Sequence, residues 1–401
     1  MTDLVILLDI GTTTISAEIF DTARGLSLAG GAALNLQHEI GEDVISRIGF
    51  ALKGADNIKI LQKKAAESVN SLLRGILSKI PAGNRDFNKV FCACNSGIYH
   101  ILLGIDPSPL ITPPYRIREK AEMTVSSESI GFKFAKKARV TFLPNIGGFV
   151  GSDAFCAARA SGIYDSYDLI AVIDMGTNGE ILLGNSDKIL ASSTAAGPAF
   201  EARHIKNGMP AIKGAIVGVK IVNGKALLNV VGNTKPKGIA GSGLIEACYR
   251  LYRGGFIDKS GKMREKEFVL YGKGKNRISI TQADIRKLQF AKAAILSGIK
   301  VLLSRYNAIS RDIKEIFLTG SFGTGLDIES IVGIGLLPGP ATGKINYIQN
   351  AVLGGLRLRA MDEKANANAN TKTLALLGRI RHVPLLGRRF EKEYIRSLSF
   401  G

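Results

Sequence analysis

Two segments of the chain repeat one pattern, and this repeat constrains the fold more than any other feature. The first is VILLDIGTTTISAEIFD (residues 5–21) and the second is LIAVIDMGTNGEILLGN (residues 169–185). In each, an apolar run ends in Asp, and one further residue separates that Asp from Gly-Thr and a second apolar run. The pattern predicts two β-strands joined by a tight turn. Two copies in one chain predict a duplicated architecture with two related domains.

The length and composition agree with such a duplication. A chain of 401 residues has room for two or three domains. We expect an N-terminal lobe over residues 1–165 and a C-terminal lobe over residues 166–401, with a strand and helix in residues 379–401 packed on the second lobe. Hydrophobic residues make up 46% of the chain and charged residues 22%, which is enough apolar surface to exclude a disordered protein.

Apolar residues recur at helical spacing in two long stretches, residues 56–79 and 281–306. Thr281, with Asp284 three residues later, is the expected N-cap of the second helix. The segment KANANANT, residues 364–371, favours a loop over a frayed helix end. The shorter expected elements are helices over residues 152–161 and 243–252, a strand over 90–95, and a strand that breaks into a Gly-rich turn over 315–323.

The chain is basic, with a net charge of +19 that is spread unevenly. Residues 1–150 hold 17 Lys/Arg and 14 Asp/Glu (+3), and residues 151–401 hold 36 and 20 (+16). A basic surface attracts nucleotides, acidic proteins and nucleic acid. No helix-turn-helix, zinc-finger or RNA-binding signature occurs, so we expect no nucleic-acid partner. The second half of the chain instead suggests an acidic protein surface as partner.

Cysteine and histidine spacing argues against a resident metal. The residues are Cys92, Cys94, Cys156 and Cys248, and His38, His100, His204 and His382. They form no CxxC pair, ferredoxin ligand run or HxxxH motif, so we expect buried, reduced thiols and no iron–sulfur cluster in this chain. The N-terminus begins with an apolar strand and not a signal peptide, and no apolar stretch approaches 18 residues. We therefore expect a cytoplasmic protein without a membrane span.

The turn of each repeat carries the groups that a triphosphate and Mg²⁺ require. Backbone N–H and hydroxyl groups bind phosphate oxygens at close range, and a carboxylate holds Mg²⁺ through its water shell. Asp9 and Asp174 are therefore expected to face each other across a cleft and to share the metal. The expected donors are Gly11, Thr12, Thr13 and Thr14 in the first turn, and Gly176, Thr177 and Asn178 in the second.

ATP hydrolysis needs a water molecule in line with the γ-phosphate. Asp153 is the candidate that positions this water, because it follows GGFVG (residues 147–151) at an expected helix start; it can equally be the N-cap of that helix. Glu180 is a second candidate, either as a partner of Asp174 or as a surface-facing strand residue. Backbone donors to ribose and phosphate are expected at Gly197, Pro198 and Ala199, and at Gly241, Ser242 and Gly243.

These two turns, together with a later strand and the turn of Gly320, Ser321, Phe322 and Gly323, resemble the actin/hexokinase/Hsp70-like ATPase superfamily. The resemblance implies an α/β fold with two lobes, which are two related ribonuclease-H-like domains with a nucleotide cleft between them. It also implies that the first turn binds the β-phosphate, that the second lies on the γ-phosphate side, and that the third holds adenosine.

Longer segments are similar to the reductive activators of corrinoid proteins, in family order along almost the whole chain. They are NLQHEIGEDVISRI (35–48), YHILLGIDPSPL (99–110), PNIGGFVGSD (144–153), STAAGPAFEARHIKNGMPAIKGAI (193–216), KPKGIAGSGLIEA (235–247), QFAKAAILSGI (289–299) and GSFG…GIGLLP (320–338). The similarity is to the ATPase part of that family and lacks its iron–sulfur domain. Ala202 and Ala240 stand where the family pattern has Gly and Cys.

This resemblance implies an ATP-binding, slowly hydrolysing activator that docks on a corrinoid protein and promotes reduction of inactive Co(II) to Co(I). The implied cofactors are ATP and Mg²⁺, with the electron supplied by a separate low-potential donor. Two other functions stay open. One is a nucleotide-dependent binding or chaperone-like module for corrinoid or methyltransferase proteins, without redox activity. The other is a small-molecule kinase that uses Asp153 as general base. A homodimer is one alternative for the oligomeric state.

Overall fold

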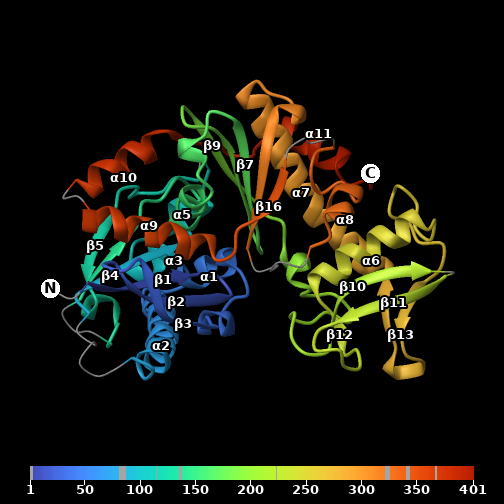
Figure 1. The fold of residues 1–401 in the computed structure, drawn as a ribbon, viewed down its shortest axis with the longest axis horizontal. Helices are drawn as coiled ribbons and strands as arrows, with labels where there is room; N and C mark the ends of the chain where they lie inside the picture. Colours follow the sequence, from blue (N-terminus) through green and yellow to red (C-terminus); the bar gives the residue numbers. More distant parts are fainter. Residues whose placement is uncertain are drawn as a thin grey trace. The chain divides into compact units, whose positions relative to one another are not determined.

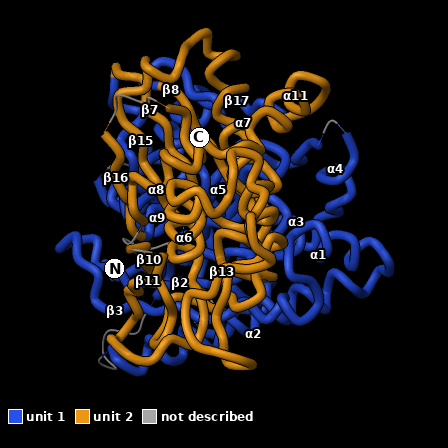
Figure 2. The backbone as a smooth tube through the Cα atoms, turned by 90° about the vertical axis from the view of Figure 1, so that its right-hand side faces the viewer, with its two compact units in different colours: residues 1–166, 185–191, 350–384 blue, residues 167–184, 192–349, 385–401 orange. Residues whose placement is uncertain are grey.

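The computed structural model describes residues 3–80, 87–113, 115–134, 138–222, 224–320, 326–339, 344–365 and 368–401. The chain forms two compact units, coloured blue and orange in Figure 2. Unit 1 comprises residues 1–166, 185–191 and 350–384, and unit 2 comprises residues 167–184, 192–349 and 385–401. The chain therefore passes between the units several times, and part of its C-terminal region belongs to the N-terminal unit.

Unit 1 is built on a six-stranded sheet of order β3-β2-β1-β4-β6-β5 (Figure 1). The strands β1, β4 and β6 run parallel, and β2, β3 and β5 run antiparallel to their neighbours. The strands are β1 (Leu4–Ile10), β2 (Thr14–Asp21), β3 (Leu26–Leu34), β4 (Lys89–Cys94), β5 (Met123–Ser126) and β6 (Arg139–Phe142). The helices are η1 (Leu36–Glu39), α1 (Val44–Ala51), α2 (Asn57–Leu77), α3 (Ser96–Leu103), α4 (Ser108–Ile111), η3 (Glu128–Ile130), α5 (Ser152–Ala160), η4 (Ile163–Asp165), α9 (Ala351–Ala365) and α10 (Ala369–Gly378).

Helix α2 covers one face of this sheet because its apolar residues recur every three or four positions. Leu61, Ala65, Val69 and Leu73 are all fully buried on that stripe, and the helix packs on β2 and β3. Helix α9 packs on β1 and β4, on the opposite face (Figure 1). The helix predicted over residues 56–79 is thereby confirmed, and the strand β1 lies inside a closed core.

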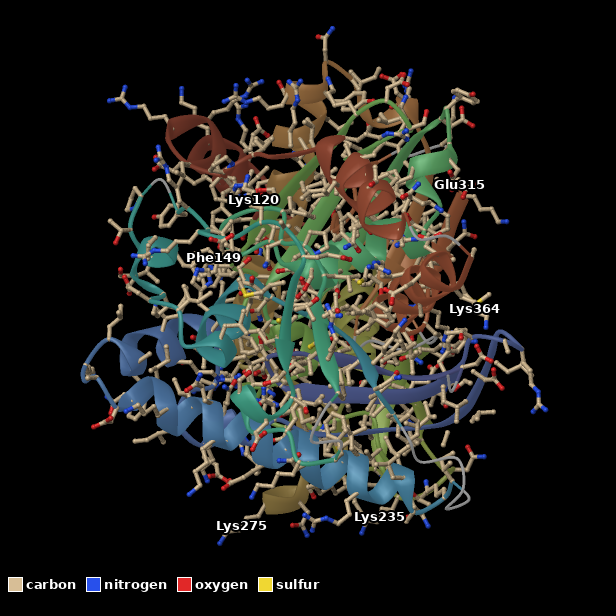
Figure 3. All side chains as sticks on the ribbon, turned by 90° about the vertical axis from the view of Figure 1, so that its left-hand side faces the viewer. Lys120, Phe149, Lys235, Lys275, Glu315 and Lys364 are labelled. Atoms are coloured by element: carbon tan, nitrogen blue, oxygen red, sulfur yellow. The ribbon has the colours of Figure 1, made fainter. Side chains whose placement is uncertain are left out.

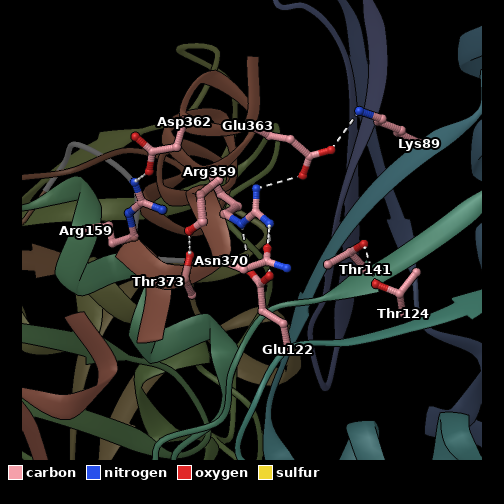
Figure 4. Close-up of polar contacts among 11 residues, drawn as sticks. Lys89, Glu122, Thr124, Thr141, Arg159, Arg359, Asp362, Glu363, Asn370 and Thr373 are labelled. Atoms are coloured by element: carbon pink, nitrogen blue, oxygen red, sulfur yellow. Dashed lines mark hydrogen bonds and ion pairs between the residues drawn. The ribbon is translucent and has the colours of Figure 1, made fainter. Parts of the chain in front are cut away.

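Ion pairs fix helix α9 to its neighbours in unit 1 (Figure 4). The guanidinium of Arg359 is almost fully buried and donates to both carboxylate oxygens of Glu122, at 2.7 and 2.9 Å. It also donates to Glu363, and Arg159 of α5 pairs with Asp362 at 2.5 Å. Such buried charges are tolerated only when they are paired and hydrogen-bonded, as they are here.

Unit 2 contains the second repeat in a sheet with the strand order β16-β15-β7-β8. The strands are β7 (Leu169–Met175), β8 (Gly179–Gly184), β10 (Ala215–Val222), β11 (Lys225–Val230), β12 (Gly238–Ile239), β13 (Glu267–Tyr271), β14 (Ile278–Thr281), β15 (Ile313–Thr319) and β16 (Lys344–Tyr347). The helices are η5 (Pro198–Glu201), α6 (Gly241–Arg253), η6 (Gly274–Asn276), α7 (Gln282–Tyr306), η7 (Ser310–Asp312), α8 (Ile328–Gly333) and α11 (Arg388–Arg396). Strand β9 (Ile189–Thr194) begins in unit 1, where it pairs with β17 (Ile380–His382).

Helix α7 forms the centre of the unit 2 core and begins as predicted. The side chain of Thr281 accepts a hydrogen bond from the Asp284 N–H, and Asp284 reaches back to the Thr281 N–H, so both halves of a capping box are present. The helix packs on β8, where Ile295 lies against Gly179. The strand and helix expected within residues 379–401 are also present, as β17 and α11.

The loop predicted over residues 364–371 is wrong for most of that segment. Helix α9 continues to Ala365 and helix α10 begins at Ala369, while residues 366–367 lie outside the described part of the chain. Alanine has the highest helix propensity, and Asn368 occupies the N-cap position of α10. Ala365 therefore ends one helix and Ala369 begins the next.

Candidate nucleotide site

The first repeat folds as the predicted hairpin, with a turn that only glycine can make. Asp9 pairs with Ser16 near the end of β1 and β2. The Gly11 N–H donates to the Thr14 carbonyl at 3.0 Å, and a Cβ atom on Gly11 would lie 2.6 Å from that oxygen. A side chain at position 11 would therefore force the turn open.

Polar side chains donate hydrogen bonds to two carbonyl groups and one hydroxyl group of this turn. Asn35 donates to the Gly11 carbonyl at 2.9 Å, and the Arg47 guanidinium donates to the Thr12 carbonyl at 2.7 Å. Asn95, which follows β4, donates to the Thr12 hydroxyl at 3.0 Å. Arg47 is fully buried, so these bonds form in a medium where they are strong. They fix the direction in which the turn faces.

The backbone N–H groups of the first turn remain available. Within the described part of the chain, those of Thr12 and Thr13 donate no hydrogen bond, whereas the Thr13 carbonyl accepts one from the Asn35 N–H at 2.8 Å. Backbone N–H groups without a protein acceptor, beside carbonyls that already have donors, are available to bind an anion such as a phosphate.

The second repeat forms a similar turn in unit 2, in which the glycine N–H bonds the carbonyl two residues later and not three. The Gly176 N–H donates to the Asn178 carbonyl at 3.2 Å, and the Thr177 carbonyl accepts from the Gly197 N–H at 2.9 Å. Among the described residues, the N–H groups of Thr177 and Asn178 have no acceptor. The Thr177 hydroxyl donates to Glu201 at 2.8 Å, which orients the side chain of Thr177.

Asp174 lies at the carboxyl end of β7, directly opposite Glu180 on β8 and Thr319 on β15. Residues directly opposite on paired strands share one face of the sheet, so Glu180 is a neighbour of Asp174. Glu180 is 8% exposed and accepts a hydrogen bond from Ser193 at 3.2 Å. The surface-facing alternative for Glu180 is therefore wrong, because a buried, hydrogen-bonded carboxylate is not a solvated strand residue.

Asp153 lies in the first turn of α5, but it is not the N-cap. Gly151 occupies that position. The residue there has to be glycine, because a Cβ atom would lie 2.3 Å from the Cys94 carbonyl oxygen. The neighbouring Ser152 hydroxyl bonds the N–H and carbonyl of Cys94, both at 3.0 Å. The N-cap alternative for Asp153 is thus wrong, and the carboxylate instead accepts from the Ala154 N–H at 2.8 Å.

Asp153 and Asp9 are both partly buried, and both act electrostatically on the same two thiols. Burial raises the pKa of Asp153 to about 6, although hydrogen bonds from the helix N-terminus act in the opposite direction. Burial also raises the pKa of the Cys94 and Cys156 thiols well above the usual range, and the charges of Asp9 and Asp153 add to both shifts. The carboxyl ends of the parallel strands β1, β4 and β6 thus gather the unit 1 residues, as expected for a ligand-binding edge.

Two further segments of unit 2 lie close to one another. Gly197 has a φ of +75° and precedes η5, which carries Pro198 and Ala199 and packs against α6. Helix α6 starts with Gly241, Ser242 and Gly243 and has no side-chain cap. A Cβ atom on Gly243 would lie 2.2 Å from the Ile216 carbonyl, so this glycine lets the helix approach β10.

Gly320 follows β15 with a φ of +110°, a region that favours glycine. Ser321, Phe322 and Gly323 lie outside the described residues. The structure thus gathers Asp9, Gly11 to Thr14 and Asp153 in unit 1. It gathers Asp174, Glu180, Gly320 and the turn of Gly176 to Asn178 in unit 2. That Asp9 and Asp174 share one metal stays a prediction.

Sequence reasoning missed the residues that support these turns, namely Asn35, Gln37, Arg47, Asn95, Ser193 and Glu201. Gln37 accepts from Arg47 and donates to the Leu61 carbonyl, so a continuous buried network reaches from the turn to α2. Most of these residues lie inside segments that carry the family resemblance, which was the available signal. Their partners are distant in sequence, however, so their roles become visible only in the fold.

The thiols behave as predicted: all four cysteines are free and buried. No group of three or more His, Cys, Asp or Glu side chains in the described ranges has the geometry to hold a metal ion. None of the helices described combines the length and apolar character that crossing a bilayer requires.

Comparison with known proteins identifies the family. Residues 4–166 match the RACo middle region, and residues 168–401 match the C-terminal domain of RACo, the ASKHA domain. The corrinoid activation enzyme RamQ of Eubacterium limosum is 31% identical over 99% of this chain and 70% of that protein. A [Co(II) methylated amine-specific corrinoid protein] reductase of Methanosarcina barkeri is 29% identical over 56% of this chain and 45% of that protein.

A solved structure agrees with this assignment. The reductive activator for corrinoid, iron–sulfur protein superposes with a TM-score of 0.88 and 32% identity, covering all of this chain and 67% of that one. The predicted α/β fold of the actin/hexokinase/Hsp70-like type is confirmed, because the C-terminal family match is an ASKHA domain. The chain belongs to the RACo family of reductive activators of corrinoid proteins.

Proposed function

We propose that this chain is an ATP-dependent activator that docks on a corrinoid protein and promotes the reduction of its cobalt from Co(II) to Co(I). Family membership supports the corrinoid partner, since relatives are named for corrinoid activation and for reduction of a Co(II) corrinoid protein. ATP binding is supported by the two hairpin turns. In both turns carbonyl groups accept hydrogen bonds, and backbone N–H groups are available to an anion.

The residues present fit a bound nucleotide. A Cβ atom on Gly11 would lie 2.6 Å from the Thr14 carbonyl oxygen, and one on Gly320 would lie 2.6 Å from Asp174 Oδ1, so these glycines keep the first turn and the Asp174 carboxylate in place. In this proposal the donors are Gly11, Thr12, Thr13 and Thr14, with Gly176, Thr177 and Asn178. The metal ligands are Asp9 and Asp174. The segments holding ribose, adenosine and the remaining phosphate oxygens are Gly197, Pro198 and Ala199, Gly241, Ser242 and Gly243, and Gly320, Ser321, Phe322 and Gly323.

Bound Mg²⁺ would neutralise the charge that develops on the phosphates during hydrolysis. In this proposal Asp153 orients the attacking water as the ionised carboxylate, and burial raises its pKa only to about 6. Glu180 holds the orientation of Asp174 from the neighbouring strand and is itself held by Ser193. Slow hydrolysis follows if no further group stabilises the transition state.

The electron comes from a low-potential donor other than these 401 residues. The four cysteines support this part of the proposal, because all are buried and burial raises the pKa of the Cys94, Cys156 and Cys248 thiols, which disfavours metal-binding thiolates. ATP binding and hydrolysis would change the affinity for the corrinoid protein or its cobalt environment, which makes the otherwise uphill reduction accessible.

The proposal also includes a homodimer through the edge strand β3. Its residues Leu26, Leu28 and Leu34 are 57%, 41% and 46% exposed, and the strand contains no charged residue that would discourage pairing with another edge. Sedimentation analysis of the wild-type chain and a Leu28→Lys variant tests it. A dimer that the variant dissociates is expected, and a monomeric wild type overturns this part.

The test of the function is the anaerobic absorbance of a Co(II) corrinoid protein mixed with this chain and a mild low-potential reductant. We expect the Co(I) band to grow only when ATP and Mg²⁺ are present, and not with an Asp174→Ala variant. If nucleotide changes the affinity for the corrinoid protein but Co(I) never forms, the chain is a nucleotide-dependent binding module instead. Phosphate transfer to an added metabolite would favour the kinase alternative.

A further inference from the structure

A long stretch of unit 2 carries only positive charges. Residues 202–245 contain seven Lys or Arg and no Asp or Glu. Two of the seven have acidic partners outside the stretch, since Arg203 pairs with Glu201 at 3.2 Å and Lys206 pairs with Glu267 at 2.8 Å. The other five form no ion pair within the described residues; they are Lys213, Lys220, Lys225, Lys235 and Lys237. All five are exposed.

The hairpin of β10 and β11 places two of these lysines on one face. In its register Lys220 lies opposite Leu227, and Val222 lies opposite Lys225. Opposite residues share a face, so Lys220 and Lys225 are diagonal neighbours, about 7 Å apart by ordinary sheet geometry. Two like charges on one face repel one another. The Glu246 carboxylate of α6 lies beside Gly218 and interacts with Lys220, so it offsets part of this charge, and an acidic partner would relieve the rest.

The same face exposes apolar side chains. Leu227 is 57% exposed and Val222 is 51% exposed, and Asn229 is exposed beside them. We call this surface, made of Lys220, Val222, Lys225, Leu227 and Asn229, the basic hairpin face. An apolar centre bordered by charged groups is the usual anatomy of a protein–protein interface.

The opposite face of the hairpin is already covered. Val219 is 1% exposed, and α6 packs on β10 there, with Gly243 against the Ile216 carbonyl. Near the turn of the hairpin the outer side is thus in solvent, whereas at Gly218 the same side meets Glu246 of α6. The exposed apolar residues on the outer side are therefore not part of the core of unit 2.

The remaining lysines extend the positive surface beyond the hairpin. Lys237 donates its N–H to the Gly214 carbonyl, and the side chain of Lys213 lies against Gly232, so both flank the start of β10. Figure 3 labels Lys235 and Lys275 toward one border of that view, and both are exposed. Lys213 and Lys237 therefore extend the positive charge from the hairpin to the start of β10, and this positive field would steer an acidic protein toward unit 2.

We propose that the basic hairpin face is the surface on which the acidic face of the corrinoid protein docks. This inference rests on the proposed function and adds the location and chemistry of the docking site. The face belongs to unit 2 and contains none of the residues assigned to the nucleotide. Substitutions on it should therefore weaken docking without weakening nucleotide binding.

The test compares two double variants that change the charge equally. Lys220→Glu/Lys225→Glu alters the basic hairpin face, and Lys53→Glu/Lys63→Glu alters exposed lysines of unit 1 that form no ion pair within the described residues. The probes are a methylated amine-specific corrinoid protein and a corrinoid, iron–sulfur protein. Affinities are measured by titration calorimetry at several salt concentrations, and ATP affinity and Tm check that each variant is folded.

We expect the wild type to bind at least one probe, and the hairpin variant to bind it at least about tenfold more weakly with a reduced salt dependence. The control variant should stay within about twofold of the wild type. A Lys220→Gln/Lys225→Gln variant should lose affinity to an intermediate extent, because it removes attraction without adding repulsion.

Two results would overturn the inference, and they differ. If the wild type binds a probe and the hairpin variant binds it equally well, the docking face lies elsewhere and the proposed function stands. If the wild type binds neither probe, the proposed function fails together with the inference. Binding of a short DNA duplex that only the hairpin variant loses would then reassign the face to nucleic acid.

Discussion

Gly320 leaves the space that the carboxylate of Asp174 occupies: a Cβ atom on Gly320 would lie 2.6 Å from Asp174 Oδ1. Gly320 also has a φ of +110°, which a residue with a side chain rarely adopts. Gly320, which follows β15, therefore helps to position the carboxylate of Asp174 in β7. Because both residues belong to unit 2, this relationship holds within one compact body.

A Gly320→Ala substitution should therefore displace Asp174 and weaken Mg²⁺·ATP binding by about tenfold or more, a loss of roughly 1.4 kcal/mol. Gly75→Ala in α2 is the control, since a Cβ atom there meets nothing within 4 Å. Nucleotide titration measures both. Equal affinities for the two variants would show that Gly320 does not position the metal ligand.

The raised pKa of Asp153 gives the ATPase activity a pH dependence. If the ionised carboxylate orients water, activity should rise as pH increases through about 6, the pKa to which burial raises this group, and should fall below it. Asp153→Asn should lose most of the hydrolysis while binding ATP with unchanged affinity. A pH profile without a limb near that value, or an active Asn variant, would remove Asp153 from the mechanism.

Arg47 should stabilise the first turn more than any surface arginine. Arg47→Met keeps the side-chain volume but removes the bonds to the carbonyls of Thr12 and Gly41 and to Gln37. We expect a loss of about 3 kcal/mol in the free energy of unfolding, because buried acceptors are left without donors. Denaturant unfolding measures it, with the exposed Arg74→Met as control. A loss below about 1 kcal/mol would contradict this account.

Ala202 has a φ of +55° at the position where the family pattern has Gly. Because Cβ disfavours that conformation, Ala202→Gly should raise the free energy of unfolding by about 1 kcal/mol. Ala199→Gly in the same segment should lower it by a similar amount, since that residue is not in the left-handed region. Thermal unfolding of both variants decides, and a shift in the same direction for both would contradict the strain argument.

The acidic residues of α9 should make unit 1 sensitive to acid (Figure 4). Burial acts to raise the pKa of Asp362 and Glu363, but hydrogen bonds and charges from Lys372, Arg159, Lys89 and Arg359 outweigh it and lower both pKa values below the ordinary 3.8 and 4.5. A depressed pKa stabilises the fold above the ordinary value, and this contribution is lost as pH falls through the folded-state pKa.

Between about pH 5 and pH 3 the wild-type chain should therefore lose more stability than an Asp362→Asn/Glu363→Gln variant. Glu391→Gln, at an exposed site in α11, serves as control. Denaturant unfolding at several pH values in this range gives the comparison. Parallel stability curves for the wild type and the α9 variant would contradict it.

The hairpins and their acids could be predicted because the signal is local. Asp9 and Asp174 each end an apolar run, and Gly11 and Gly176 follow two residues later, so the strand, the turn and the acid all lie within one short segment. The Thr281 capping box is local in the same way. Such patterns depend on neighbours in sequence and need no knowledge of the tertiary fold.

The side chains that hydrogen-bond these turns could not be predicted, because they come from segments that are distant in the sequence. Asn35, Arg47 and Asn95 converge on Gly11 and Thr12 from the end of β3, from α1 and from the end of β4. The role of Gly151 as N-cap, instead of Asp153, depends on the close approach of the Cys94 carbonyl. The hydrogen bond from Ser193 of β9 to Glu180 likewise joins residues of two different strands.

The measurement that tests the central claim most directly is a double-mutant cycle on Mg²⁺·ATP affinity with Asp9→Asn, Asp174→Asn and the double variant. If the two hairpin turns form one nucleotide site, each single change removes most of the Mg²⁺-dependent affinity and the double change adds little more, so the two effects are strongly non-additive. If the two losses simply add, or if either single variant binds Mg²⁺·ATP like the wild type, the two acids do not serve one metal and the account is contradicted.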